Sequence, residues 1–171
     1  SNRKRRSRKI KDVFLALKGQ NPSGRRGKPQ PDTIVPKKEI KVLSADANGN
    51  LSMQRITKAK MSFADCIRLD LSDGKSITCT PSHEIFTLKS GYIKASELKI
   101  GDCLVSIDRA KSPQIVKISQ VGQRAVYDIA VENNNNFFAN GVLVHNCVDE
   151  IDVIANPKAY EEAKFIPAPW G

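Results

Sequence analysis

The chain has 171 residues, 40% of them hydrophobic, and carries 28 Lys and Arg against 18 Asp and Glu, a formal net charge of +10. This length suits one domain with short tails, and the apolar content excludes a wholly disordered chain. No apolar run approaches the length of about 20 residues that a bilayer-spanning helix needs. The basic N-terminus also lacks the apolar segment of a secretory signal.

The positive charge is concentrated in the first fifth of the chain. Residues 1–38 contain 13 Lys and Arg and two acidic residues, a net charge of +11, whereas the other 133 residues carry 15 basic and 16 acidic ones. A basic run such as SNRKRRSRK is typical of nucleic-acid-binding proteins. However, no aromatic residues that would stack on bases alternate with these charges, and no recognisable reader motif follows them. A basic nucleic-acid-binding protein is therefore the alternative interpretation.

The basic N-terminal segment, residues 1–38, is expected to contain a short helix and a flexible loop. Residues 10–17 (IKDVFLAL) have apolar side chains at the spacing of an amphipathic helix, and Gly19 follows at a typical stop position. The stretch 19–38 is rich in Gly, Pro and basic residues and has no apolar periodicity. We therefore predict a flexible loop there.

From Glu39 onward the pattern becomes that of short β-strands. Five alternating runs separated by turn signals are predicted to be strands: IKVLSA, SMQRITKA, DCIRLDL, KSITCT and HEIFTL. A helical turn is expected at 95–98, and further strands at Cys103–Ile107, Gln114–Gln120, Ala125–Val131 and Val142–Val144. Many short strands and few helices predict an all-β domain over residues 39–146.

The four cysteines, at positions 66, 79, 103 and 147, form no Cys-x-x-Cys pair, and the chain has only two His residues. A zinc site is therefore not expected, and neither is any other metal or cofactor. Thiols in a reducing compartment, the cytoplasm, are the expected state.

Three clusters contain residues suited to chemistry. In the first, Thr78-Cys79-Thr80-Pro81-Ser82-His83, Thr80 and His83 can place a hydroxyl and an imidazole beside one peptide bond, polarise it and protonate a departing amide nitrogen. Thr-x-x-His alone is a weak pattern, and an isolated His is usually structural.

The second cluster is Val144-His145-Asn146-Cys147. The Asn146 side-chain amide can attack its own backbone carbonyl, close a succinimide and break the chain, and His145 can assist this reaction. Cys147 places a nucleophile one bond downstream. The alternative is a polar strand end before a buried cysteine, but the composition changes at this same peptide bond.

The third cluster extends from Val126 through the run Asn133–Asn136 to Gly141. Asp128 is predicted on a strand and can set the ionisation state of a nearby thiol. Without the other clusters, it would be interpreted as a surface carboxylate.

In their order, these clusters resemble the splicing domain of inteins, which has the Hint fold shared with hedgehog autoprocessing domains. DGKSITCTPSHEIFT and GYIKASELKIGD resemble the Thr-x-x-His block and the stretch after it, and VYDIAVENNNNFFANGVLVHNC resembles the two C-terminal splicing blocks. The resemblance covers about residues 40–147. It implies a horseshoe-like all-β Hint fold over 39–146 and single-turnover, autocatalytic protein splicing.

By position, the resemblance implies a role for each candidate residue. Thr80 and His83 would activate the upstream splice junction, Asp128 would govern the thiol of Cys147, and Asn146 would cyclise with help from His145. Cys147 would begin the downstream host segment, the C-extein, over residues 147–171. Only about 20 residues separate Asp108 from Asp128, too few for a homing endonuclease, so a mini-intein is implied.

Two departures from the family pattern matter. Asn135 stands where the family commonly has a His, and an amide cannot act as an acid or base near neutral pH. Lys9-Ile10-Lys11-Asp12-Val13 resembles the segment that follows the first strand of an intein, and no cysteine precedes Cys66. The expected explanations are a split intein completed by a short N-terminal partner, expected to be acidic, or a continuous intein whose first residues are not in this sequence.

The C-terminal tail carries five acidic and two basic residues and ends in a Pro-rich stretch. Val148-Asp149-Glu150 resembles the end of a Walker B strand of P-loop ATPases, and the residues after it resemble a phage terminase large subunit. No phosphate-binding Gly-rich loop is present in the sequence, so an ATPase activity of this chain itself is not expected.

Overall fold

The fold was analysed in a computed structural model, which describes residues 7–19, 32–37, 39–108 and 111–145, and the backbone of 152–154. The described residues form two multistranded sheets and one α-helix, so the all-β prediction is confirmed. Among the described residues, no helix has the length and apolar character needed to cross a membrane.

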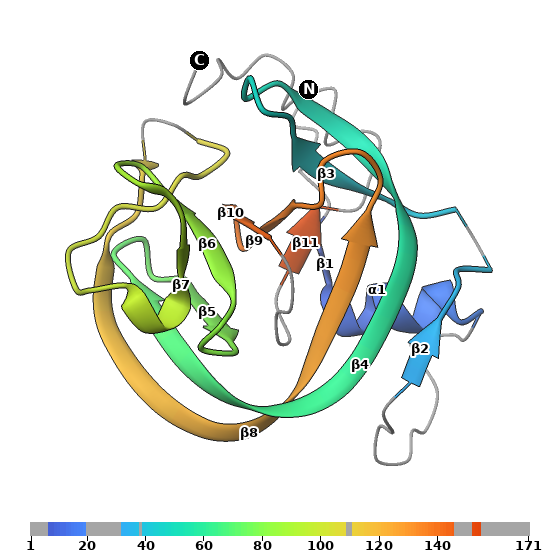
Figure 1. Ribbon diagram of the computed structural model, residues 1–171, viewed down its shortest axis with the longest axis horizontal. Helices are drawn as coiled ribbons and strands as arrows, with labels where there is room; N and C mark the ends of the chain where they lie inside the picture. Colours follow the sequence, from blue (N-terminus) through green and yellow to red (C-terminus); the bar gives the residue numbers. More distant parts are fainter. Residues whose placement is uncertain (1–6, 20–31, 38, 109–110, 146–151, 155–171) are drawn as a thin grey trace.

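One sheet is built around a long curved strand. β4 (Leu51–Leu71) pairs with β8 (Ile115–Val131) along most of its length, and with three shorter strands: β2 (Asp32–Ile34), β3 (Lys41–Ala45) and β5 (Ser76–Cys79). The β4–β8 ladder shifts register at Ile56/Lys58, Cys66/Ile67 and Asp70/Leu71. Such bulges bend a strand pair, and Figure 1 shows the two strands following one arc around the inner strands.

The second sheet lies within this arc. Its strand order is β1-β11-β9-β10-β6-β7, with β1 (Ser7–Lys9), β11 (Asp152–Ile154), β9 (Phe137–Ala139), β10 (Val142–Val144), β6 (Glu84–Thr87) and β7 (Gly91–Lys94). β9 and β10 form a hairpin through Asn140 and Gly141, whose φ angles are 48° and 81°. Asn-Gly is the pair that a two-residue hairpin with positive φ at both positions favours.

The predicted N-terminal helix is confirmed as α1 (Ile10–Leu17). Its four periodic apolar residues are buried in the same core cluster as residues of β4 and β8: Ile10, Val13, Phe14 and Leu17. Phe14 packs edge-on against Tyr127 of β8, with ring centroids 5.4 Å apart. The helix ends before Gly19, which has a φ of 78° and donates its N–H to the Ala16 carbonyl (2.9 Å).

Three local predictions differ from the structure. SMQRITKA and DCIRLDL are parts of the single strand β4, and the two runs expected between Gln114 and Val131 are the single strand β8. Gly122, which lies between the two expected runs, has a φ of 75° at a register shift and not in a turn. Cys103–Ile107 makes only isolated bridges. The helical turn is confirmed as η1 (Ala95–Glu97).

Five strands lie where none was predicted: β1, β2, β7, β9 and β11. Two of them belong to the basic N-terminal segment, residues 1–38. Asp32–Ile34, within the expected flexible loop, pairs with β4 as β2, and Ser7–Lys9, within the basic run, pairs with Asp152–Ile154 of the expected C-extein. Both are three-residue segments without a clear apolar alternation, and backbone pairing with a neighbouring strand forms them.

Candidate splicing site

The Thr-x-x-His segment forms a tight turn between β5 and β6. The His83 N–H donates to the Thr80 carbonyl (3.1 Å), which closes the turn. The 3₁₀ turn η1, which follows β7, holds this turn in place, because the Ala95 N–H donates to the His83 carbonyl (2.7 Å) and the Ser96 N–H donates to the Pro81 carbonyl (2.9 Å). The position of His83 is therefore set by backbone contacts.

The His83 imidazole is buried, with 3% of the residue exposed. Neither Nδ1 nor Nε2 has a hydrogen-bond partner within the part of the chain that the structure describes. Burial, together with the nearby charge of His145, lowers the pKa of His83 from 6.5 to about 3. The ring is therefore neutral at pH 7, and its N–H can donate to a peptide group or its bare nitrogen can accept a proton.

His145 is brought close to this turn by β10. Val144 pairs with Ile85 of β6, and the His145 N–H donates to the carbonyl of Glu84, the residue after His83 (3.0 Å). The half-buried imidazole of His145 packs edge-on against Tyr92 of β7, with ring centroids 5.2 Å apart and planes at 75°. The structure thus brings Thr80, His83 and His145 into one region, although they are up to 65 positions apart in the sequence.

His145 lines a cavity of about 360 Å³ at this end of the inner sheet. Two aromatic side chains, Phe86 and Tyr92, form one wall and pack edge-on at 4.9 Å. The other walls come from the end of β3 and its turn, from β10 and from the asparagine run: Ala45, Asp46, Ala47, Leu143, Asn133, Asn134 and Asn136. The cavity lies beside the last described residue before Asn146.

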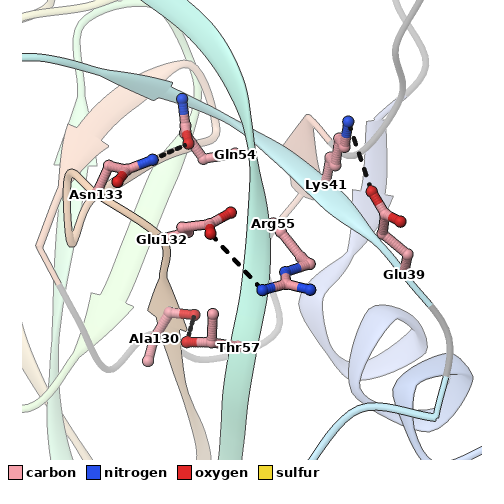
Figure 2. A network of polar contacts seen from close by, with 8 residues as sticks. All are labelled: Glu39, Lys41, Gln54, Arg55, Thr57, Ala130, Glu132 and Asn133. Atoms are coloured by element: carbon pink, nitrogen blue, oxygen red, sulfur yellow. Dashed lines mark hydrogen bonds and ion pairs between the residues drawn. The ribbon is translucent and has the colours of Figure 1, made fainter.

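The asparagine run is a turn held on β4 (Figure 2). Asn133 Nδ2 donates to Gln54 Oε1 (2.9 Å), and the Glu132 N–H donates to the Arg55 carbonyl (2.9 Å). The Arg55–Glu132 ion pair, at 3.6 Å between half-exposed side chains, adds little free energy. Backbone and amide contacts therefore determine where the residues after Glu132 lie.

Asn136 is the buried member of the run. Its Oδ1 accepts from Ser44 Oγ (2.7 Å) and from the Ala45 N–H (3.0 Å), and its Nδ2 donates to the Ala45 carbonyl (2.9 Å). Burial raises the pKa of the Tyr92 phenol, and a hydrogen bond with Asn136 acts in the opposite direction. Asn136 thus connects β3 with the aromatic wall of the cavity.

Replacing Asn136 with Ala is expected to lower the free energy of unfolding by about 2–4 kcal/mol, because the buried N–H and carbonyl of Ala45 lose their partner. The matched control is Asn133→Gly, which removes one exposed hydrogen bond to Gln54, suits the φ of 67° at this position, and is expected to cost about 0.5 kcal/mol or less. Urea unfolding of both variants checks this. Equal destabilisation would contradict the assigned role of Asn136.

Asn135, which stands where the resemblance places a His, is exposed and has a φ of 55°. It does not line the cavity, whereas both Asn134 and Asn136 do. Asn is one of the few residues that adopt this left-handed conformation readily, so the backbone favours it here. The titratable side chains of the cavity wall are instead His145, Tyr92 and Asp46.

The remaining candidates are placed as follows. Asp128 lies half-buried on β8, opposite Lys60 of β4 in the ladder. Asn146 and Cys147 lie outside the described residues. Within those residues, no group of three or more His, Cys, Asp and Glu is arranged to hold a metal ion.

Sequence reasoning missed two residues of this site, Tyr92 and Asn136. Tyr92 occurs within GYIKASELKIGD, where its partner His145 is 53 positions away. Asn136 is one of four consecutive asparagines, and only burial separates it from the other three. The one available signal was its position directly before the apolar pair Phe137-Phe138.

Comparison with solved structures identifies the fold. A transcription factor IIB Mvu mini-intein has a TM-score of 0.63 at 22% identity, covering 80% of this chain and 87% of that one. An intein from a hyperthermophile has a TM-score of 0.64 at 19% identity (80% and 86%). A DnaB intein from Synechocystis sp. PCC 6803 has 0.59 at 21% identity (64% and 81%). The chain has the Hint fold of inteins, as its motifs predicted.

Among curated proteins, the DNA polymerase II large subunit of Methanoculleus marisnigri is 28% identical over 131 residues, which are 70% of this chain and 10% of that protein. A DNA polymerase of Thermococcus aggregans is 29% identical over 118 residues, 63% of this chain and 6% of that protein. The chain thus matches a tenth or less of the length of these relatives. No family model matches it.

Proposed function

We propose that this chain is an autocatalytic protein-splicing element that acts once, on its own backbone. One observation carries the proposal. Within an intein fold, the turn that bears His83 lies beside His145, and His145 lines an aromatic-walled cavity at the point where the chain leads into Asn146-Cys147. The curated relatives support it, because a match to a small part of two long polymerases is expected of an inserted element.

The downstream half of the reaction uses residues of this chain. Asn146 Nδ2 attacks the Asn146 carbonyl carbon, a succinimide closes, and the bond to Cys147 breaks as its nitrogen takes up a proton. His145 polarises that carbonyl or transfers the proton. Before this step, the Cys147 thiolate attacks the carbonyl carbon of the thioester or ester at the upstream junction, with Asp128 governing the thiol. The upstream host segment is then bonded to Cys147 Sγ, and the first nucleophile leaves as a thiolate or, from an ester, as an alcohol that has taken up a proton. A reducing cytoplasm keeps the Cys147 thiol available.

At the upstream junction, His83 and Thr80 activate the peptide bond that precedes the first nucleophile. The buried, neutral His83 ring, with both nitrogens unpartnered among the described residues, suits polarisation of a peptide group that docks against it. The nucleophile-bearing strand comes from a short N-terminal partner fragment, in a split intein, or from preceding chain, in a continuous mini-intein. We favour the split form, with an acidic partner drawn to the basic residues of 1–38.

The host protein is proposed from the tail alone. Residues 148–150 suit a Walker B strand end, and a phage terminase large subunit fits best the residues that follow. Apart from the backbone of 152–154, residues 147–171 lie outside the described part of the chain, so this assignment stays a prediction.

Intact-mass measurement of the purified chain tests the proposal. We expect scission after Asn146, with loss of residues 147–171, and we expect Asn146→Ala to abolish it. A synthetic peptide that supplies a Cys-bearing intein strand should add ligated product, and Cys147→Ala should block ligation while leaving cyclisation possible. Ligated product from the Cys147→Ala chain would contradict the mechanism.

The alternative function, binding of nucleic acid through residues 1–38, predicts a different result. The chain would then stay intact and bind oligonucleotides with an affinity that falls steeply as salt rises. The burial of α1 in the core favours splicing, because four of the residues in this segment serve the fold.

A further inference from the structure

The inner sheet contains a strand position that the downstream segment occupies. β11 (Asp152–Ile154) lies between β1 and β9, pairing antiparallel with both: Lys9, Arg8 and Ser7 are opposite Asp152, Val153 and Ile154, and Val153 is also opposite Ala139. Strands that flank a third lie about 9–10 Å apart, so β1 and β9 define a slot one strand wide. In Figure 1, β11 lies beside β9 within the arc.

β9 is held in place without β11, and β1, whose partner among the described strands is β11, is anchored at its C-terminal end by α1. β1 runs directly into α1, whose first residue, Ile10, is fully buried in the core. β9 is held on its other edge by β10, and its three residues are buried: Phe137, Phe138 and Ala139. The strand pairing with β11 is only three residues long, so the slot can persist while its occupant changes.

The charges of β1 favour an acidic segment in the slot. β1 contains Arg8 and Lys9, both exposed, in a segment that carries +11 over residues 1–38. The segment that occupies the slot, VDEIDVI (148–154), has three acidic residues and no basic one, and Asp152 is the register partner of Lys9. Opposite charges at facing positions of an antiparallel pair stabilise the pairing.

We propose that the slot between β1 and β9 is a binding site for one extended acidic peptide segment, and that residues 152–154 fill it intramolecularly. This proposal rests on the proposed function. It implies that the C-extein competes with the incoming acidic N-terminal strand for the position beside β1. The peptide bond after Asn146 then lies in a six-residue connector, 146–151, between His145 and β11. Binding is by strand addition, with backbone hydrogen bonds supplying affinity and charge supplying selectivity.

A peptide-binding assay tests the slot without any splicing chemistry. All chains carry Asn146→Ala, which keeps the downstream segment attached. The probe is a fluorescent peptide of this chain's own residues 148–156, VDEIDVIAN. Val153→Pro removes the N–H of the central β11 residue, and the matched control, Val153→Thr, keeps it along with a β-branched side chain.

We expect the peptide to bind the Val153→Pro chain at least about tenfold more tightly than the Val153→Thr chain. In the latter, the attached segment competes at an effective concentration in the millimolar range. Amide exchange at residues 7–9 and 137–139 should speed up in Val153→Pro and slow again with peptide. A peptide with Pro in place of its Val153 should not bind, and salt should weaken binding of the original peptide.

Equal affinity for the two chains, or no binding to a Val153→Pro chain whose β4–β8 amides stay protected, would overturn the proposal. If Val153→Pro fails to fold, the pair Asp152→Lys and Asp152→Asn replaces it, because a lysine opposite Lys9 should release the segment at low salt. Failure with that pair overturns the proposal as well. Scission after Asn146 in the unmodified chain is measured separately, so the slot and the splicing function can fail independently.

Discussion

Replacing His145 with Ala is expected to slow scission after Asn146 by about 100- to 10,000-fold, the range that a positioned general acid or base contributes. The imidazole belongs to the residue directly before Asn146 in the chain, and its ring lies against Tyr92 beside the cavity. The exposed Asn135 cannot take over proton transfer. The rate is measured by intact mass over time.

The matched control for His145 is Tyr92→Leu, which removes the ring contact but keeps the imidazole. We expect a smaller loss of scission rate than in His145→Ala, because the His145 backbone stays hydrogen-bonded to Glu84. If Tyr92 only orients the His145 ring, Tyr92→Phe should cleave at a rate near that of the unmodified chain. A His145→Ala chain that cleaves within threefold of the original, with its amide protection intact, would remove His145 from the mechanism.

Acid is expected to destabilise the chain through His83. The unfolded chain binds a proton at His83 with a pKa of 6.5, whereas burial lowers the pKa to about 3 in the folded state. Between these values the unfolded state holds more protons, so stability falls as pH drops below 6.5. At about 1.4 kcal/mol per pH unit, the free energy of unfolding should fall by about 3 kcal/mol between pH 7 and pH 4.5.

Urea unfolding at the two pH values checks this, with His83→Phe as the control that cannot titrate. The control should lose about 3 kcal/mol less than the original chain over the same interval. Asp32 and Asp46 also have lowered pKa values, but these exposed carboxyl groups titrate below their usual value of 3.8 and so act mainly under more acidic conditions. An equal loss in both chains would contradict the burial of a neutral His83.

Those parts of the site that depend on residues close together in the chain could be predicted from the sequence. Thr80 and His83 are three positions apart, and a turn was enough to place them together. Helix α1 followed from its apolar spacing, and the alternating runs identified the strands. The spacing of apolar residues in a sequence shows which face of a helix or strand is buried, and these predictions needed no more than that.

The remaining features depend on contacts between distant segments. Two pairs of expected strands are single strands, because the β4–β8 ladder continues through residues 60–64 of β4 and, past a bulge at Cys66/Ile67, through residues 122–124 of β8. The role of Tyr92 requires β7 and β10 to pair with opposite edges of β6, and that of Asn136 requires β3 to lie beside the asparagine run. β11 forms because residues 152–154 pair with the backbones of β1 and β9, so the sequence of these three residues does not by itself predict a strand.

The β4–β8 ladder also has a consequence for folding kinetics. Its innermost pair, Leu71 with Ile115, encloses 43 residues, and its outermost pair, Ile56 with Val131, encloses 74. Long-range pairing of this kind is slow, because loop-closure entropy is lost before the contacts form. The hairpin that carries His145 follows β8 in the chain and packs inside its arc. We therefore expect the ladder to delay the proposed scission after Asn146 until the arc has closed, so that the rate of folding determines when the reaction can begin.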